Sequence, residues 1–146
     1  MLVYNVTDFI IIHYLGSKEV TMYNVLNKVF SVAFSFINAF MIPYWARTTQ
    51  AIASGDINWI RKTMKKMYKL FCIVALGYIV LGFIAEPAIA IWLGRRIDFK
   101  LELKLVMCLF YVFYTFIVVN TPFINGTGKI KFQMILSTAM GFINVP

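Results

Sequence analysis

The sequence predicts an all-α membrane protein, a polytopic bundle of transmembrane helices. Of its 146 residues, 61% are hydrophobic and only 14% are charged, whereas about a quarter of the residues of a soluble domain are charged. The mean hydropathy is +0.78. A chain with so few charges cannot cover a globule with a polar surface. Its apolar segments also lack the period-two alternation of outer-membrane strands, so helices are the fold class that fits.

Apolar residues gather in five segments, at about 1–15, 20–45, 70–94, 105–124 and 130–146. The middle three have the roughly 20 residues that a helix needs to cross about 30 Å of hydrocarbon. The first and the last are too short for that. We therefore expect about three complete and two partial transmembrane helices, and we interpret 1–146 as a partial transmembrane lobe, a fragment of a longer protein.

The longest polar stretch, 46–69, separates the second and third apolar segments. Within it, "SGDINWIRKTMKKMYK" predicts an amphipathic helix that begins after Ser-Gly-Asp. Ile57, Ile60, Met64 and Met67 recur every three or four residues and share one face, while the lysines lie on the other. We expect an amphipathic linker helix here.

Lysine and arginine residues predict the orientation. Eight of them lie on the side of the 46–69 linker, and five lie on the opposite side. Cytoplasmic loops carry the excess of Lys and Arg, so the linker is expected in the cytoplasm. The net charge of +8 is explained by the same topological role, and we expect no binding to nucleic acid.

A polar face runs along the predicted helix 20–45. On a helix, residues three and four apart lie on the same side, and this side carries Asn24, Asn27, Lys28, Ser31, Ser35 and Asn38. The opposite side is apolar. A polar face inside a membrane must contact protein or a water-filled cavity, so we expect these six residues to line a substrate cavity. Tyr111, Tyr114, Thr115, Asn120 and Thr121 give the helix 105–124 a weaker polar face.

Lys28 is the residue of this face that is most costly to place in a membrane, because its charge lies about two helical turns inside the predicted span. Asp8, in the first segment, is expected at a similar depth and is the obvious partner. Two interpretations remain open: a structural Asp8–Lys28 ion pair, or a cavity cation that meets an anionic substrate and exchanges with Asp8. Glu86, next to Pro87, is either a carboxylate that reaches water at a kink or a site of ion coupling.

Nothing in the sequence predicts catalysis, a bound metal or a cofactor. Cys72 and Cys108 lie inside apolar segments without CxxC spacing, so we expect small buried hydrophobic residues.

Several motifs follow one another along the chain: "TDFIIIHYLGSKEVTMYNVLNKVFSVAFSFINAFMIPYWARTTQAIASGD", then "NGTGKIKFQ" and a terminal "NVP". Their order gives the chain a resemblance to polysaccharide flippases of the multidrug/oligosaccharidyl-lipid/polysaccharide superfamily. It covers essentially the whole chain and places it at the start of the second lobe. It implies a missing N-terminal lobe, a multi-pass location in the bacterial inner membrane, and no enzymatic activity.

The resemblance also implies a function, the transfer of undecaprenyl-diphosphate-linked oligosaccharide across that membrane for surface polysaccharides such as the O-antigen of lipopolysaccharide. Lys28 and Asp8 match positions that meet the sugar and the diphosphate in such a cavity. Two alternatives stay open: a cation-coupled multidrug exporter of the same superfamily, and a non-transporting membrane scaffold of envelope assembly.

Overall fold

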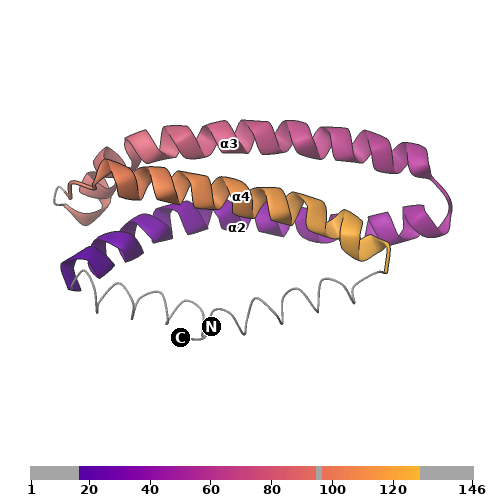
Figure 1. Cartoon of the computed structure of the whole chain (residues 1–146), viewed down its shortest axis with the longest axis horizontal. Helices are drawn as coiled ribbons and strands as arrows, with labels where there is room; N and C mark the ends of the chain where they lie inside the picture. The colour runs from indigo at the N-terminus through magenta and orange to yellow at the C-terminus, as the bar shows by residue number, and fades with distance from the viewer. Residues whose placement is uncertain (1–16, 95–96, 129–146) are drawn as a thin grey trace. The chain divides into compact units, whose positions relative to one another are not determined.

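The computed structural model describes residues 17–94 and 97–128, which form three long α-helices (Figure 1). These are α2 (Ser17–Ala53), α3 (Ile57–Leu93) and α4 (Leu101–Gly126). All three are long and apolar enough to cross a membrane, and no strand occurs in the described ranges. The predicted all-α membrane fold is therefore confirmed. The partial spans expected at 1–15 and 130–146 lie outside the described residues.

The helices α2 and α3 are longer than the apolar segments that predicted them. α2 continues to Ala53, and α3 begins at Ile57 and runs unbroken to Leu93, so the amphipathic helix expected in the linker is the first part of α3. Each has 37 residues. At about 1.5 Å per residue that is roughly 55 Å, well beyond about 30 Å of hydrocarbon. Both helices must therefore extend out of the membrane, and the limits of the spans stay predictions.

A three-residue turn joins α2 to α3. Gly55 has a φ of 71°, in the left-handed region that glycine adopts without strain. The Asp56 carboxylate then accepts a hydrogen bond of 3.0 Å from the Trp59 backbone N–H. Asp56 therefore caps the N-terminus of α3, as the Ser-Gly-Asp signal predicts.

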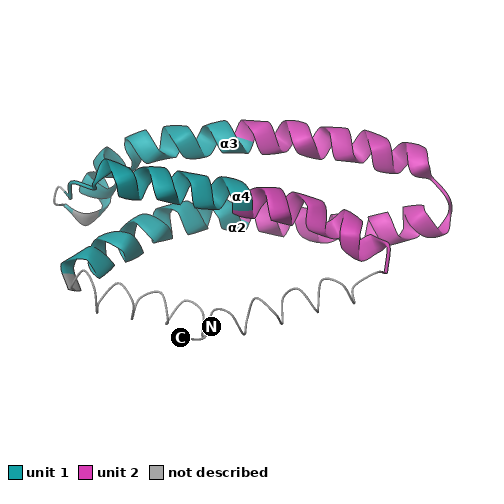
Figure 2. Ribbon diagram, in the orientation of Figure 1, with its two compact units in different colours: residues 1–35, 74–113 teal, residues 36–73, 114–146 magenta. Residues whose placement is uncertain are grey.

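The chain divides into two compact units, and each helix contributes to both (Figure 2). Unit 1 comprises 1–35 and 74–113, and unit 2 comprises 36–73 and 114–146.

Three aromatic rings form the centre of unit 1, one from each helix. Phe30 of α2 lies 5.9 Å from Tyr78 of α3 and 5.4 Å from Tyr111 of α4, and the two tyrosine rings lie 5.8 Å apart, all between ring centroids. All three residues are buried. Such pairs add about 0.5–1.5 kcal/mol each beyond the area that they bury. This aromatic trio therefore holds the three helices together in unit 1.

Unit 2 has a smaller core of Met41, Met67, Val119 and Phe123. On the predicted apolar face of the linker helix, Met67 is buried and Ile60 and Met64 are partly buried, but Ile57 is 60% exposed. Ile57, the first residue of α3, is therefore not part of this core.

Large apolar side chains cover the outside of both units. Phe36 and Phe83 are each 73% exposed and Ile91 is 86% exposed. Soluble proteins rarely expose contiguous apolar surface of this kind, whereas lipid or further helices cover it in a membrane. Cys72 is also exposed, next to the exposed Ile73, so the prediction that it is buried is wrong. Its side of α3 is not covered by the helices of its own unit.

Gly126 lets α4 approach α2 closely in unit 2. A Cβ atom at this position would lie 2.7 Å from Thr48 Cγ2, 3.1 Å from Thr48 Cβ and 3.3 Å from the Thr49 backbone nitrogen. Thr48 is fully buried and β-branched, and it cannot move aside easily. Small residues commonly allow such approaches between membrane helices.

We expect Gly126→Ala to destabilise the protein by about 1–3 kcal/mol, because the added methyl group overpacks the contact with Thr48. The matched control is Gly77→Ala in α3, where a Cβ atom would meet nothing within 4 Å. Thermal unfolding in detergent, followed by circular dichroism, measures both. Equal melting temperatures for the two variants would contradict the close contact.

Candidate functional site

The predicted polar face lies along α2. Asn24, Asn27, Lys28, Ser31 and Ser35 belong to unit 1, and Asn38 belongs to unit 2. Lys28, Ser35 and Asn38 are exposed, while the other three are partly buried. The structure therefore places the six residues in different surroundings. Their hydrogen-bond partners also differ.

The two serines of this face bond to their own helix. The Ser31 hydroxyl donates to the Lys28 carbonyl at 2.9 Å, and the Ser35 hydroxyl donates to the Ser31 carbonyl at 2.8 Å. This is the usual way in which a hydroxyl is satisfied on a helix in apolar surroundings. Each oxygen keeps lone pairs that can accept a hydrogen bond from water or a ligand.

Asn27 joins α2 to α4. Its side-chain oxygen accepts a hydrogen bond of 2.7 Å from the Tyr111 hydroxyl, which belongs to the aromatic trio. Asn27 therefore fixes the helical turn that carries Lys28. The sequence predicts Asn27 in a cavity but does not identify this partner, although Tyr111 belongs to the weak polar face of 105–124.

Lys28 has no charge partner among the described residues, and its side chain is exposed. The two partly buried carboxylates of unit 1 are used by other lysines: Glu19 pairs with Lys100 at 3.0 Å, and Glu86 pairs with Lys104 at 2.8 Å. Asp8 lies outside the described residues, so the Asp8–Lys28 pair remains a prediction. Within 17–94 and 97–128, the Lys28 ammonium keeps all three of its donors available.

Glu86 has a structural partner that the sequence analysis did not identify. Its carboxylate accepts hydrogen bonds from Lys104 Nζ at 2.8 Å and from the Phe99 backbone N–H at 3.2 Å. It therefore ties the start of α4 and the preceding loop to α3. The signal was present in the spacing, since Glu86 lies near the end of one helix and Lys104 in the first turn of the next.

Glu86 also lines a cavity of about 380 Å³ in unit 1, together with Pro87, Ala90, Ile91, Ile97 and Asp98. The described residues contain no group of three side chains able to hold a metal ion. Two carboxylates therefore line this cavity: Glu86 is already paired with Lys104, and Asp98 is exposed.

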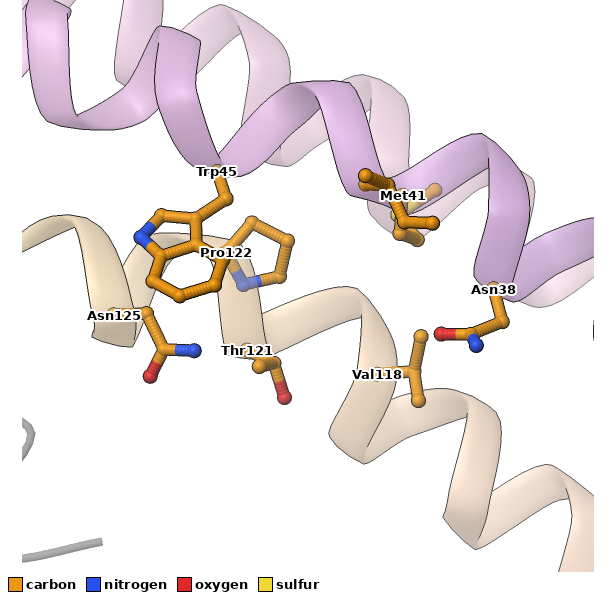
Figure 3. A pocket seen from close by; sticks show the side chains of 8 residues that line it. Asn38, Met41, Trp45, Val118, Thr121, Pro122 and Asn125 are labelled. Carbon is orange, nitrogen blue, oxygen red and sulfur yellow. The ribbon is translucent and has the colours of Figure 1, made fainter.

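A second cavity, of about 280 Å³, lies between α2 and α4 in unit 2 (Figure 3). We call it the amide pocket. Its lining consists of Asn38, Met41, Ile42 and Trp45 from α2 and Val118, Thr121, Pro122 and Asn125 from α4. Both sets follow the spacing i, i+3, i+4, i+7 of a single helix face. The sequence predicts Asn38 as a site residue and Thr121 on a weak polar face, but it does not indicate Trp45 or Asn125.

The Glu86–Lys104 pair is expected to stabilise the fold measurably, because only 17% of the Lys104 side chain and 34% of the Glu86 side chain are exposed. Lys104→Met should lower stability by about 1–3 kcal/mol, since it removes a hydrogen bond to a partly buried charge. Glu86→Gln combined with Lys104→Met should recover part of the loss. The control is Lys100→Met, which breaks a pair whose lysine is 64% exposed and should change stability by less than about 1 kcal/mol. Stability is measured by unfolding in detergent. An equal loss of stability in Lys104→Met and Lys100→Met would contradict a stabilising role for the Glu86–Lys104 pair.

The comparison with known proteins agrees with this architecture. The sequence matches the MatE protein family over residues 1–146, which is the whole chain. No curated protein and no solved structure matches it significantly. Members of the matched family are transporters, and three helices of this chain can each cross a membrane. The chain therefore belongs to the MatE family of multi-pass membrane transporters.

Proposed function

We propose that this chain is part of a flippase that moves undecaprenyl-diphosphate-linked oligosaccharide across the bacterial inner membrane, for surface polysaccharides such as O-antigen. One observation carries the proposal. Lys28 lies within a helix able to cross a membrane, it is exposed on a polar face, and no described residue pairs with it.

A lysine ammonium inside a membrane span is energetically unfavourable unless an anion or water compensates its charge. A lysine at the centre of a membrane helix costs at least about 2.5 kcal/mol on insertion scales, and water or a counter-charge must offset it. The expected position of Lys28 is about 12 Å along the axis from residue 20. Water around Ser31 and Ser35 lowers part of this cost. A diphosphate, with several negatively charged oxygens, would match the three donors of the ammonium.

Asp8 has a defined role in this proposal. When the site is empty, its carboxylate neutralises Lys28, and an arriving diphosphate competes for the same ammonium. Such an exchange keeps the apo state stable without making the substrate bind too tightly to leave.

The mechanism is alternating access between two lobes, one of which contains this chain. The lipid tail stays in the bilayer, against the apolar outer surface, while the head group crosses in a hydrated cavity. The partner is a second, N-terminal lobe, because the helices described here leave much of their surface uncovered. Binding sites between such lobes typically lie near the middle of the membrane.

A cationic drug fits this site less well than an anionic head group. Two like charges 4 Å apart repel by about 4 kcal/mol at an effective dielectric constant near 20. A free ammonium on the cavity face therefore disfavours the exporter alternative. The scaffold alternative differs in that it would bind the lipid-linked glycan without moving it.

We expect Lys28→Ala, made in the complete transporter, to reduce flipping of a fluorescent lipid-linked oligosaccharide in proteoliposomes by at least tenfold while the protein still inserts. Lys28→Arg should retain part of the activity, because the charge survives although its shape changes. The matched control is Lys18→Ala, an exposed lysine in the first turn of the same helix.

A second outcome separates the structural interpretation from the functional one. If the Asp8–Lys28 pair only holds two helices together, Lys28→Ala should lower protein levels, and Asp8→Asn with Lys28→Met should restore both folding and flipping. Restored flipping in that double variant would rule out a role for Lys28 in binding the substrate.

The turn at Ser54 is expected in the cytoplasm and Ser17 on the opposite side. Single cysteines at these two positions, in a background in which Cys72 and Cys108 are replaced by alanine, can be tested with a membrane-impermeant thiol reagent on intact cells. Only Ser17→Cys should react. Labelling of Ser54→Cys alone would show that the chain has the opposite orientation.

A further inference from the structure

The amide pocket of unit 2 holds polar groups that the helices leave without partners. Asn125 Oδ1 is buried and has no hydrogen-bond partner in the part of the chain that the structure describes. A buried carbonyl-type oxygen without a donor is unfavourable by about 1–3 kcal/mol. Asn38, exposed at the same pocket, also makes no side-chain hydrogen bond within the described ranges. Two carboxamides without side-chain partners among the described residues thus line one cavity.

The rest of the lining is apolar and aromatic. Trp45 reaches from α2 toward α4 and lies beside Pro122 and Asn125, while Asn38 lies at the other end of the pocket near Val118 (Figure 3). The Trp45 side chain is half exposed, so one part of its indole ring remains open to a ligand. The Thr121 hydroxyl donates to the Ile117 carbonyl at 2.8 Å, which leaves its oxygen as an additional acceptor.

This lining selects one chemical class of ligand. No lining residue carries a charge, so neither a phosphate nor a cation would find a counter-ion. Carboxamides donate and accept at adjacent atoms, which matches neighbouring hydroxyl groups. The face of an indole ring carries negative partial charge and attracts the weakly positive C–H face of a saturated ring. At about 280 Å³, the pocket is just below the range of roughly 300–1,000 Å³ that small-molecule sites occupy. It fits one ring rather than a chain of rings.

We propose that the amide pocket binds one uncharged pyranose ring, stacked on Trp45 and hydrogen-bonded by Asn38 and Asn125. Its source as the glycan of a lipid-linked oligosaccharide rests on the proposed function. The pocket then recognises a sugar of the substrate, separately from the diphosphate that Lys28 binds. It lies in the C-terminal parts of α2 and α4, on the side that the charge distribution places toward the cytoplasm, where a lipid-linked sugar would be taken up.

The experiment measures the fluorescence of Trp45 in the chain embedded in nanodiscs. Trp59→Phe and Trp92→Phe remove the other two tryptophans. The probes are the methyl glycosides of glucose, galactose and N-acetylglucosamine, the undecaprenyl-diphosphate-linked glycan extracted from host cells, and the cation tetraphenylphosphonium. We expect a saturable change with at least one glycoside and with the lipid-linked glycan, and none with the cation.

Variants connect the signal to the pocket. Asn125→Leu should weaken binding of the glycoside at least tenfold, and Asn38→Leu, at an exposed position that tolerates substitution, should weaken it as well. Asn58→Leu is the matched control, since Asn58 is exposed in the same unit and does not line the pocket. No response to any glycoside, a saturable response to tetraphenylphosphonium, or equal binding by all three variants would overturn the proposal.

The two proposals can fail separately. If the lipid-linked glycan co-purifies with the nanodiscs but Trp45 does not respond, the pocket assignment is wrong and the proposed function stands. If the glycosides bind at Trp45 but the lipid-linked glycan does not, the pocket takes a free sugar, and the proposed function is wrong.

Discussion

The bilayer core contains no water, and this constraint shapes the polar groups of the helix segments that cross it. Backbone groups are satisfied within helices, which are the only open-ended elements that can cross such a layer. Side-chain hydroxyls follow the same rule: Ser35 donates to the Ser31 carbonyl at 2.8 Å, and Thr121 donates to the Ile117 carbonyl at 2.8 Å. Polar residues can therefore sit on these helices at small cost when their own helix supplies the partner.

Other polar side chains hold the helices together. Asn27 pairs with Tyr111 in unit 1, the Tyr68 hydroxyl donates to Asn120 at 2.9 Å in unit 2, and Glu86 pairs with Lys104. These contacts connect helices that apolar packing alone would leave free to slide, because lipid tails are as apolar as leucine. Against this background, Lys28, Asn38 and Asn125 differ: none has a partner in the described ranges. Under the proposed function, these three residues are the ones that meet water or the ligand.

Much of the fold could be predicted from the sequence, because the length and polarity of apolar segments are local properties. The three complete helices and the capped start at Asp56 follow directly from them. The ends of α2 and α3 could not be predicted from hydropathy, since a helix continues past the membrane wherever its backbone bonds are satisfied. The amphipathic linker and the third apolar segment are for this reason one helix.

The site was harder to predict than the fold, because a polar side chain does not reveal its partner. Lys28 and Asn27 are neighbours on one predicted face, yet Asn27 joins two helices. The reason is its hydrogen bond with Tyr111 of α4, which the sequence does not reveal. Asn125 follows Thr121 by four residues and so shares its face, but its position in the last turn of α4 made it look like part of a turn. The Glu86–Lys104 pair depends on how the chain turns between α3 and α4, and hydropathy does not predict that geometry.

If Lys28 binds the substrate as proposed, the face of α2 around it is wet inside the membrane. The most direct measurement is cysteine scanning of positions 24–38 in the complete transporter lacking its native cysteines, with the rate of reaction toward a small hydrophilic thiol reagent. We expect fast reaction at Lys28, Ser31 and Ser35 and slow reaction at the exposed apolar positions Val32 and Phe36, so that the rate varies with a helical period. Uniformly slow reaction along the helix, or equal rates on both faces, would contradict it.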